Sequence, residues 1–523
     1  MGEYLRFIIR RERRISLIWL LSITASVLIF TSLYPTLVPT HAETLALATS
    51  MQNPAMVAMM GPVYGLAQIT PAIIMSQETL IWYLIAVAIM NIFLITRHTR
   101  GDEEFGRIEL LLAKPISVRI PTLAPLIFAI IINAIIALAS ALGVLIINIE
   151  GTTFLGALSF GLAIGGVGLY FAALTLLFAQ IFSTSSGVFS ASFITVGLMY
   201  MIRALADVEQ SPLTLISPFG VALQMEVFYS NRLTLLLFLL LPSLFFIDIA
   251  LLLNSIRDHG SGLIAQRPGK RRASAFLRSP FGLAWHLSKP STLAWGGGIF
   301  LLGLSYGSVI GDLTSFVENN ELMQQIILSS GPNTLLDGYV ALIFSIMASV
   351  VSVPVILSTL RIYNEEITAR AELLFSRPTS RRALYTPFLI IAFGESIMMF
   401  ILLAIGLALG GGGVLSLGEI IGYGLAYLPA VWLFGAVGVF IVGFIPALRS
   451  LIWLFFASTF IITYTDFITP LPSYLTKLNP FVFIPHLPVE EFKILPLLIL
   501  TISSALLITG GLVRYENRDL SNG

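Results

Sequence analysis

The sequence predicts an all-α integral membrane protein with about twelve transmembrane helices, arranged as two parallel, pseudo-symmetric six-helix halves that each carry a short cytosolic coupling helix. Three observations predict this class. Of the 523 residues, 57% are hydrophobic and only 11% are charged, whereas soluble domains average roughly 25% charged residues. The apolar residues fall in long runs, and a charged segment of the first half recurs in the second. The composition therefore excludes an ordinary soluble enzyme.

Each apolar run is long enough to cross the hydrocarbon core, which takes about 20 residues in a helix. The first half contains the runs 15–35, 79–96, 120–147, 154–182, 186–206 and 232–254. The second half contains the runs 291–312, 338–360, 383–410, 417–445, 448–468 and 494–513. We expect residues 1–256 and 291–523 to form the two transmembrane halves. A basic cytosolic linker, 257–290, should join them and carry an interfacial helix.

The first run follows a cluster of arginines, as a signal peptide would. The apolar stretch of a cleavable signal peptide is only about 7–15 residues long, however. The run at 15–35 is longer, and no convincing small-residue cleavage site follows it. We therefore predict that this segment is retained as the first membrane span.

The basic residues indicate how the spans are oriented. With the N-terminus in the cytosol, only four of the 29 Lys and Arg residues lie outside, namely Arg203, Arg232, Lys477 and Lys493. The other 25 fall in cytosolic segments. Cytosolic loops of membrane proteins carry an excess of Lys and Arg. The distribution therefore predicts a multi-pass protein of the cell membrane with both termini in the cytosol.

A charged segment after the second span is repeated after the eighth. Residues 102–119 align with residues 365–382 at a shift of 263 positions and share eight identities. At nearly the same shift, Arg257 after the sixth span matches Arg518 after the twelfth. The chain is therefore interpreted as two fused six-span halves. Because six is an even number, both halves enter the membrane from the same side and form parallel repeats.

The repeated segment has the pattern of a short amphipathic helix. Glu103 and Arg107 are four residues apart with the acid first, which favours an ion pair on a helix, and the second copy preserves this spacing. Pro115 and Pro378 should end the two helices. Two interpretations remain open: a surface helix that anchors the loop, or a docking element for a cytosolic partner. The duplication favours a partner that binds twice.

The pattern E-x-x-x-R-x-E-L-L-x-x-[KR]-P-x-S-x-R after the second span resembles the membrane subunits of type-2 ABC exporters, also called ABC-2 type permeases. The fused twelve-span form resembles the polyketide-antibiotic exporter permeases, such as the tetronasin-resistance type. In that family the segment between the second and third spans contacts the ATP-binding subunit. The resemblance thus implies partner coupling at Glu103, Arg107, Glu109, Pro115 and Ser117, and at Glu366, Arg370, Glu372, Pro378 and Ser380. The copies differ at Val118, where the second has Arg381.

The chain has no G-x-x-x-x-G-K-[ST] motif, whose loop and lysine hold the phosphates of a nucleotide. We therefore expect a transporter subunit that is not itself an enzyme and binds no cofactor. Two copies of a separate cytosolic subunit would bind ATP and Mg²⁺. The chain lacks Cys, and its five His residues show no ligand spacing, so no catalytic or metal-binding residue is predicted. The basic linker fits contact with anionic membrane lipid better than contact with nucleic acid.

Polar residues inside the spans are candidates for the substrate pathway, because such groups are expensive to bury in a membrane. Glu395 lies near the middle of the ninth span, and Asn133 lies in the corresponding region of the third. Glu395 either contacts the substrate, carries a proton or bonds to a neighbouring helix.

Small residues at i,i+4 spacing let helices approach closely. The fourth span contains Gly161 and Gly165, and the tenth contains Gly418 and Gly422. Both pairs would allow a close helix contact, and such spacings occur in helical bundles of every kind.

Taken together, these patterns predict an exporter permease that moves an amphipathic or hydrophobic compound, antibiotic-like, drug-like or lipid-like, out of the cell. Transport would proceed by alternating access, powered by a separate ATP-binding subunit. The alternative is a proton-coupled secondary multidrug transporter of major-facilitator architecture, which also has twelve spans in two parallel halves. Few intramembrane charges, the repeated surface helix and the lack of a G-x-x-x-D-[RK]-x-G-[RK] loop argue against it.

Overall fold

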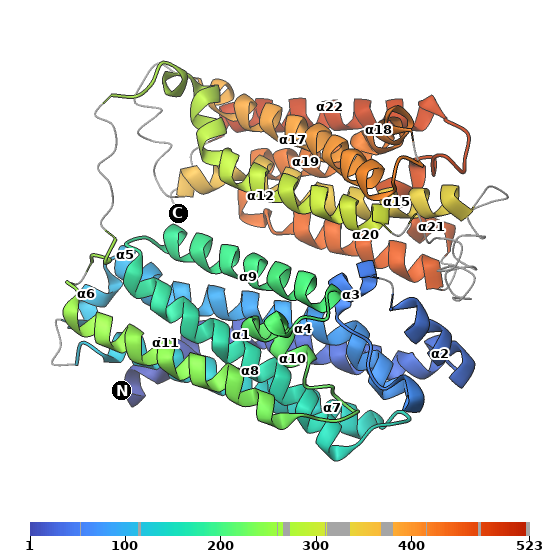
Figure 1. Cartoon of the computed structure of the whole chain (residues 1–523). Coiled ribbons are helices and arrows are strands. Elements are labelled where there is room, and N and C mark those ends of the chain that lie inside the picture. The colour runs from blue at the N-terminus through green and yellow to red at the C-terminus, as the bar shows by residue number, and fades with distance from the viewer. Residues whose placement is uncertain are drawn as a thin grey trace. The chain divides into compact units, whose positions relative to one another are not determined.

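The computed structural model divides the chain into two compact units, Met1–Gly269 and Lys270–Gly523. The residues that it describes are 1–52, 54–112, 117–258, 260–264, 272–308, 310, 335–367, 380–414, 416–468 and 472–518. Within each unit the long helices run roughly parallel to one another (Figure 1). No β-strand occurs among the described residues, apart from one isolated bridge between Phe182 and Ile264. The all-α class is confirmed.

The helices of both units follow the predicted apolar runs. The helices of the first unit are α1 (Gly2–Leu37), α2 (His41–Ser50), α3 (Pro54–Met60), α4 (Pro71–Thr96), η2 (Arg97–Gly101), α5 (Asp102–Glu104), α6 (Arg107–Leu112), α7 (Ile120–Ile147), α8 (Phe154–Ile181), α9 (Ser185–Val208), α10 (Pro218–Leu223) and α11 (Leu237–Ile256). Those of the second are η5 (Phe276–Arg278), α12 (Pro280–Ser308), α15 (Leu335–Ile367), α17 (Arg381–Gly410), α18 (Leu417–Ala426), α19 (Leu428–Phe444), α20 (Leu451–Ile468), α21 (Ser473–Thr476) and α22 (Ile494–Asn517).

Ten segments of the described chain are helical, long and apolar enough to cross a membrane, so this is a multi-pass membrane protein. They coincide with all six predicted spans of the first half and four of the second. Of the predicted spans 291–312 and 448–468, residues 291–308 lie in α12 and residues 451–468 lie in α20, and neither helix is among the ten. The apolar stretch at α20 is shorter and covers Pro446–Ile462. The total of twelve spans stays a prediction.

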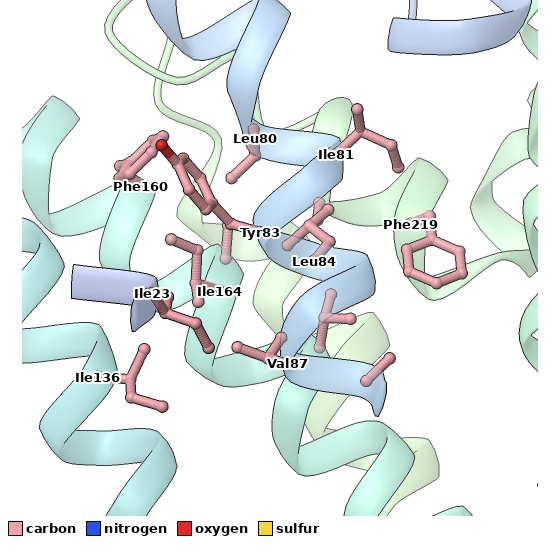
Figure 2. Close-up of a cluster of buried hydrophobic side chains, with 14 of the residues drawn as sticks. Ile23, Leu80, Ile81, Tyr83, Leu84, Val87, Ile136, Phe160, Ile164 and Phe219 are labelled. Carbon is pink, nitrogen blue, oxygen red and sulfur yellow. The ribbon is translucent and has the colours of Figure 1, made fainter. Parts of the chain in front are cut away.

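The core of the first unit forms around α8, which packs against α4, α7, α9 and α11. Most of α4 and α8 is buried, whereas α1, α9 and α11 expose most of their apolar surface. Figure 2 shows where α1, α4, α7, α8 and α10 meet, at the side chains of Ile23, Leu80, Ile81, Tyr83, Leu84, Val87, Ile136, Phe160, Ile164 and Phe219. The rings of Tyr83 and Phe160 meet edge to face with 6.0 Å between centroids. Such large exposed apolar faces around a dry core require lipid as the solvent.

Glycines decide how closely some of these helices approach. A Cβ atom on Gly161 of α8 would lie 2.2 Å from the carbonyl oxygen of Ala137 in α7, and one on Gly165 would lie 2.9 Å from the Ala137 Cβ. The close contact that this spacing allows is therefore present at Gly161 and Gly165. At Gly418 and Gly422 no described atom lies within 4 Å of a Cβ placed on either residue.

The second unit uses its glycines at a different seam, between α12 and α17. A Cβ on Gly303 or Gly307 would lie 2.6 or 2.5 Å from a carbonyl oxygen of α17. A Cβ on Gly406 or Gly410 would come equally close to carbonyl oxygens of α12. Both helices therefore present glycine at i,i+4 spacing, and their backbones touch directly.

The first long helix of each unit joins the segment before a predicted span to that span. α1 runs without a break from Gly2 to Leu37, so the arginine-rich segment and the first span form one helix. α12 likewise joins the end of the predicted linker to the seventh span, with Pro290 inside the helix. Within the predicted linker, the short helix η5 is followed by α12, which starts at Pro280 and runs on into the predicted seventh span.

Replacing Gly161 with Ala should destabilise the protein, since the added methyl group collides with the α7 backbone. We expect a loss of about 1–3 kcal/mol in the free energy of unfolding, the usual cost of overpacking. Thermal unfolding in detergent measures it. Gly197→Ala is the matched control, because Gly197 lies in α9 with no atom within 4 Å of an added Cβ. Equal stabilities of the two variants would contradict the close contact.

Candidate functional site

The repeated charged segment of the first unit begins directly at the end of α4. The helix passes through one π-helical turn, η2, and then through the single turn α5. Gly106 follows with a φ of +69°, a conformation that suits glycine, and α6 starts after it. The predicted single helix is therefore two short pieces. The predicted ion pair between Glu103 and Arg107 is wrong, because the break at Gly106 takes the two side chains off a common helix face.

Glu103 instead pairs with Arg257, just beyond the end of α11. Two guanidinium nitrogens of Arg257 lie 2.7 and 2.9 Å from the two carboxylate oxygens of Glu103. The backbone N–H of Gly260 donates to the same carboxylate at 2.7 Å, and Arg100 lies 3.1 Å away. The side chains of Glu103 and Arg257 are only 6% and 8% exposed. Such bidentate pairs combine strength with a defined geometry.

Arg257 and Arg100 also bind the end of α8. The Nε of Arg257 donates to the side chain of Gln180 at 2.7 Å. Arg100 donates two hydrogen bonds to the carbonyl oxygen of Ala179, at 3.0 and 2.6 Å. Both arginines also donate to the carbonyl of Ser261. The pair of Glu103 and Arg257 therefore ties together the ends of α4, α8 and α11, and we call it the first clamp.

The second unit repeats this arrangement. A nitrogen of Arg518, at the end of α22, lies 2.6 Å from the carboxylate of Glu366 near the end of α15. Both side chains are buried, and the Arg518 guanidinium lies over the ring of Tyr515. Glu103 and Arg257 are the repeat equivalents of Glu366 and Arg518. We call this pair the second clamp.

The loop is also bonded to α1. Asp102 accepts from Arg11 of α1 at 2.7 Å and from Arg107 of α6 at 2.9 Å. His98 lies between two carboxylates, with Nε2 3.2 Å from Glu12 of α1 and Nδ1 3.6 Å from Asp102. The side chains of Glu12, His98 and Asp102 are buried. α1 is therefore fixed against the loop by charge as well as by apolar packing.

The remaining predicted coupling residues lie on the surface where the structure describes them. Arg107, Glu109, Ser117 and Ser380 are exposed. Ser380 accepts from the backbone N–H of Ala383 and caps the start of α17. The other predicted coupling residues, Pro115, Arg370, Glu372 and Pro378, lie outside the described residues.

Asn133 lies in the core of the first unit as half of an amide pair. It donates to the side-chain oxygen of Asn91 at 2.8 Å, and Asn91 donates back at 3.0 Å. Each amide also donates to the carbonyl four residues earlier in its own helix, Ala129 or Val87. The pair thus links α4 to α7 with its donors fully used.

Glu395 lies in the second unit where α12, α15 and α17 meet, and it is buried. Thr292 of α12 donates to one carboxylate oxygen at 2.8 Å, and Ser358 of α15 donates to the other at 2.5 Å. The side chain therefore bonds two neighbouring helices. A carboxylate can accept further hydrogen bonds beyond these two.

Sequence reasoning missed both clamps, although the signal was present. Glu103 and Arg257 are 154 residues apart, and Glu366 and Arg518 are 152 apart. Both members of each pair recurred in the repeat, and residues repeated together are candidates for contact. In the described part of the chain, no group of three His, Asp or Glu side chains is arranged to hold a metal ion.

Comparison with known proteins shows similarity along both units. Residues 277–516 match the family described as multidrug efflux system permease Rv1217c, C-terminal domain. Over 525 aligned positions the chain is 30% identical to the multidrug efflux system permease protein Rv1217c of Mycobacterium tuberculosis (strain ATCC 25618 / H37Rv). The alignment covers 99% of this chain and 94% of that relative.

Breaking the first clamp should be costly. Arg257→Gln leaves Glu103 as a buried carboxylate without its main partner, which costs about 3–5 kcal/mol. Arg232→Gln is the matched control, because Arg232 pairs with Glu226 at 2.8 Å but is about half exposed, and exposed pairs contribute about 0–1 kcal/mol. Unfolding in a denaturing detergent measures both. The exchange Glu103→Arg with Arg257→Glu should recover part of the loss; no recovery would contradict direct pairing.

The amide pair can be tested by removing one or both members. Asn133→Leu leaves the side chain of Asn91 buried with an unmade hydrogen bond, at a cost of about 1–3 kcal/mol. Replacing both residues with Leu should restore most of the stability, because no polar group is then stranded. Thermal unfolding measures the three variants. If the double variant is as unstable as the single one, the pair does not carry the contact between α4 and α7.

Proposed function

Because the chain belongs to the family of the multidrug efflux system permease Rv1217c, we propose that it is the transmembrane permease of an ABC exporter. It moves an amphipathic or hydrophobic compound, drug-like or lipid-like, out of the cell. A separate cytosolic subunit binds ATP and Mg²⁺ and supplies the energy. The observation that carries the proposal is the pair of clamps: the first ties the loop after α4 to the end of α11, and the second ties the end of α15 to the end of α22.

Each clamp fixes the end of the helix from which the loop starts. A buried ion pair is expensive unless its geometry is good and its other polar atoms are satisfied, and the first clamp meets both conditions through Gly260, Gln180 and Ser261. Its recurrence in the second unit supports a role that both units share. Both units therefore bind the same kind of partner, and two ATP-binding subunits serve one chain.

The site residues then divide into two roles. Glu103 and Glu366, which the resemblance implied as partner contacts, are positioning residues, because their carboxylates face Arg257 and Arg518 inside the protein. The exposed Glu109, with Arg107 beside it, forms the surface that meets the partner in the first unit. Because the first clamp binds the ends of α4, α8 and α11 to one another, a movement of the partner is transmitted to all three helices. This is the structural basis for alternating access driven from the cytosol.

Few polar groups are available to a substrate inside the spans, and this supports an apolar or amphipathic compound. The amide of Asn133 is engaged by Asn91, so it holds helices together. Glu395 keeps acceptor capacity after its bonds to Thr292 and Ser358. It is therefore the polar group that we assign to the substrate pathway.

A charge reversal on the exposed coupling surface tests the proposal. Glu109→Lys should reduce co-purification with the ATP-binding subunit, and ATP-dependent export of a fluorescent drug from vesicles, by about tenfold, because like charges at an interface repel. Glu209→Lys is the control. Glu209 is also exposed, but it directly follows the last residue of α9, whereas the first residue of α9 lies on the predicted cytosolic side. Unchanged complex formation and export in Glu109→Lys would overturn the docking assignment.

The same vesicles separate an ABC exporter from a proton-coupled secondary transporter. Export by the permease with its partner should stop when ATP is withheld and continue when the proton gradient is collapsed. Export without nucleotide that is lost with the proton gradient would replace the proposal by the alternative, and Glu395→Gln would then abolish it.

A further inference from the structure

A groove of about 800 Å³ lies in the first unit between α1, α4 and the start of α9. This volume is within the range of about 300–1,000 Å³ that is typical of ligand sites. Neither the clamps nor the pathway group Glu395 lines it. Its walls come from α1 over Phe7–Trp19, α4 over Met90–Thr96, the loop that follows α4, and α9 over Ser185–Phe189.

The two ends of the groove differ in chemistry. At one end Arg11, Arg97 and Arg107 line the groove, beside Glu12. The other walls are formed by the apolar side chains of Ile15, Trp19, Met90, Phe93 and Phe189. Met90 precedes Arg97 in the chain, and at a rise of 1.5 Å per residue the two lie about 10 Å apart along the helix axis. The groove therefore has the shape and polarity of an amphiphile, with a charged head and an apolar tail.

The charged end has a surplus of positive charge. Arg11 and Arg107 share one carboxylate, Asp102, and Arg97 pairs with Glu12. A third carboxylate, that of Glu104, accepts hydrogen bonds from Ser185, which lines the groove, so the surplus comes from the arginines of α1 outside these pairs. The side chains of Arg97 and Arg107 stay 45% and 52% exposed in these pairs. Four further exposed arginines lie on the same end of α1, at Arg6, Arg10, Arg13 and Arg14. The head that fits this end is an anion.

The apolar walls indicate that the occupant is a lipid and not a soluble anion. Ile15 and Phe93 line the groove and are 41% and 48% exposed. Hydrocarbon against these side chains removes apolar surface that a small anion would leave uncovered. The arginine-rich end also lies on the side of the membrane that the distribution of Lys and Arg assigns to the cytosol, where anionic lipids attract basic residues.

We propose that this groove binds an anionic phospholipid of the inner leaflet. Its phosphate lies against Arg97 and Arg107, and an acyl chain lies along Met90, Phe93 and Phe189. The lipid covers the seam between α1, α4 and α9 and so stabilises α1 beside the loop. This site goes beyond the proposed export function and does not depend on it.

Binding of defined lipids to the purified full chain in detergent tests the head-group assignment. Phosphatidylglycerol should bind more tightly than phosphatidylcholine and raise the unfolding temperature more. Arg97→Gln with Arg107→Gln should weaken phosphatidylglycerol binding by about fivefold for each arginine removed, while phosphatidylcholine binding is unchanged. Arg97→Lys with Arg107→Lys should retain the preference. Arg232→Gln is the control, since Arg232 is also 52% exposed with one acidic partner but does not line the groove.

A second variant tests the tail. Ser16→Trp fills the apolar part of the groove without changing its charge, and it should reduce phosphatidylglycerol binding as strongly as loss of the arginines. Ser32→Trp, at an exposed position of the same helix, is its control. This pair keeps the test valid if removal of two arginines impairs folding.

Three results would overturn the proposal. The first is equal binding of phosphatidylglycerol and phosphatidylcholine to the unmodified chain. The second is inorganic phosphate at millimolar concentration raising the unfolding temperature as much as phosphatidylglycerol, because the groove would then hold a soluble anion. The third is a Ser16→Trp variant that binds phosphatidylglycerol normally but loses export, which would assign the groove to the substrate.

Discussion

The packing of each unit depends on a buried carboxylate–guanidinium pair at one end of its helices. In the first unit, Glu103 and Arg257 join the segment after α4 to the segment after α11, and hydrogen bonds from the same arginine reach the end of α8. Neither charge could be buried alone, because an unpaired ion at low dielectric costs several kcal/mol. The two therefore require each other, and helices far apart in the sequence are held in one arrangement. The second unit reaches the same solution with Glu366 and Arg518.

Away from the clamps, the helices are held by apolar packing and by a few satisfied polar groups. In lipid, apolar contact between helices gains little from the hydrophobic effect, so close fit and interhelical hydrogen bonds decide which helices adhere. The glycine seam between α12 and α17 provides the close fit. The pair of Asn91 and Asn133, and Glu395 with its two hydroxyl donors, provide the hydrogen bonds. The two units thus share their clamp, while the residues that make the close contacts and the hydrogen bonds between their apolar helices differ.

The cytosolic end of the first unit combines three kinds of surface within a short distance along the chain. Glu103 faces inward and fixes the loop, Glu109 faces outward, and Arg107 both binds Asp102 and lines the groove beside α1. In the proposed function this rigid, charged end receives force from a partner. The proposed lipid groove beside it would make α1, of whose apolar stretch only 22% is buried, respond to the composition of the membrane.

The sequence by itself determined the membrane class, the position of most spans, the duplication and the location of the charged loops, because hydropathy, period and repeat are properties of short segments. It also placed the small-residue contact at Gly161. The tertiary structure alone decided which charges pair. Glu103 lies four residues from Arg107, as a helical ion pair requires, yet the left-handed Gly106 breaks that helix and Arg257, 154 residues away, takes its place. Likewise, Gly418 and Gly422 have the spacing of a helix contact, but no described atom lies near them. The glycines of α12 and α17 have the same spacing and lie against each other's helix. Local spacing limits which groups can face each other, but only the packing of distant helices selects the partner that buries them.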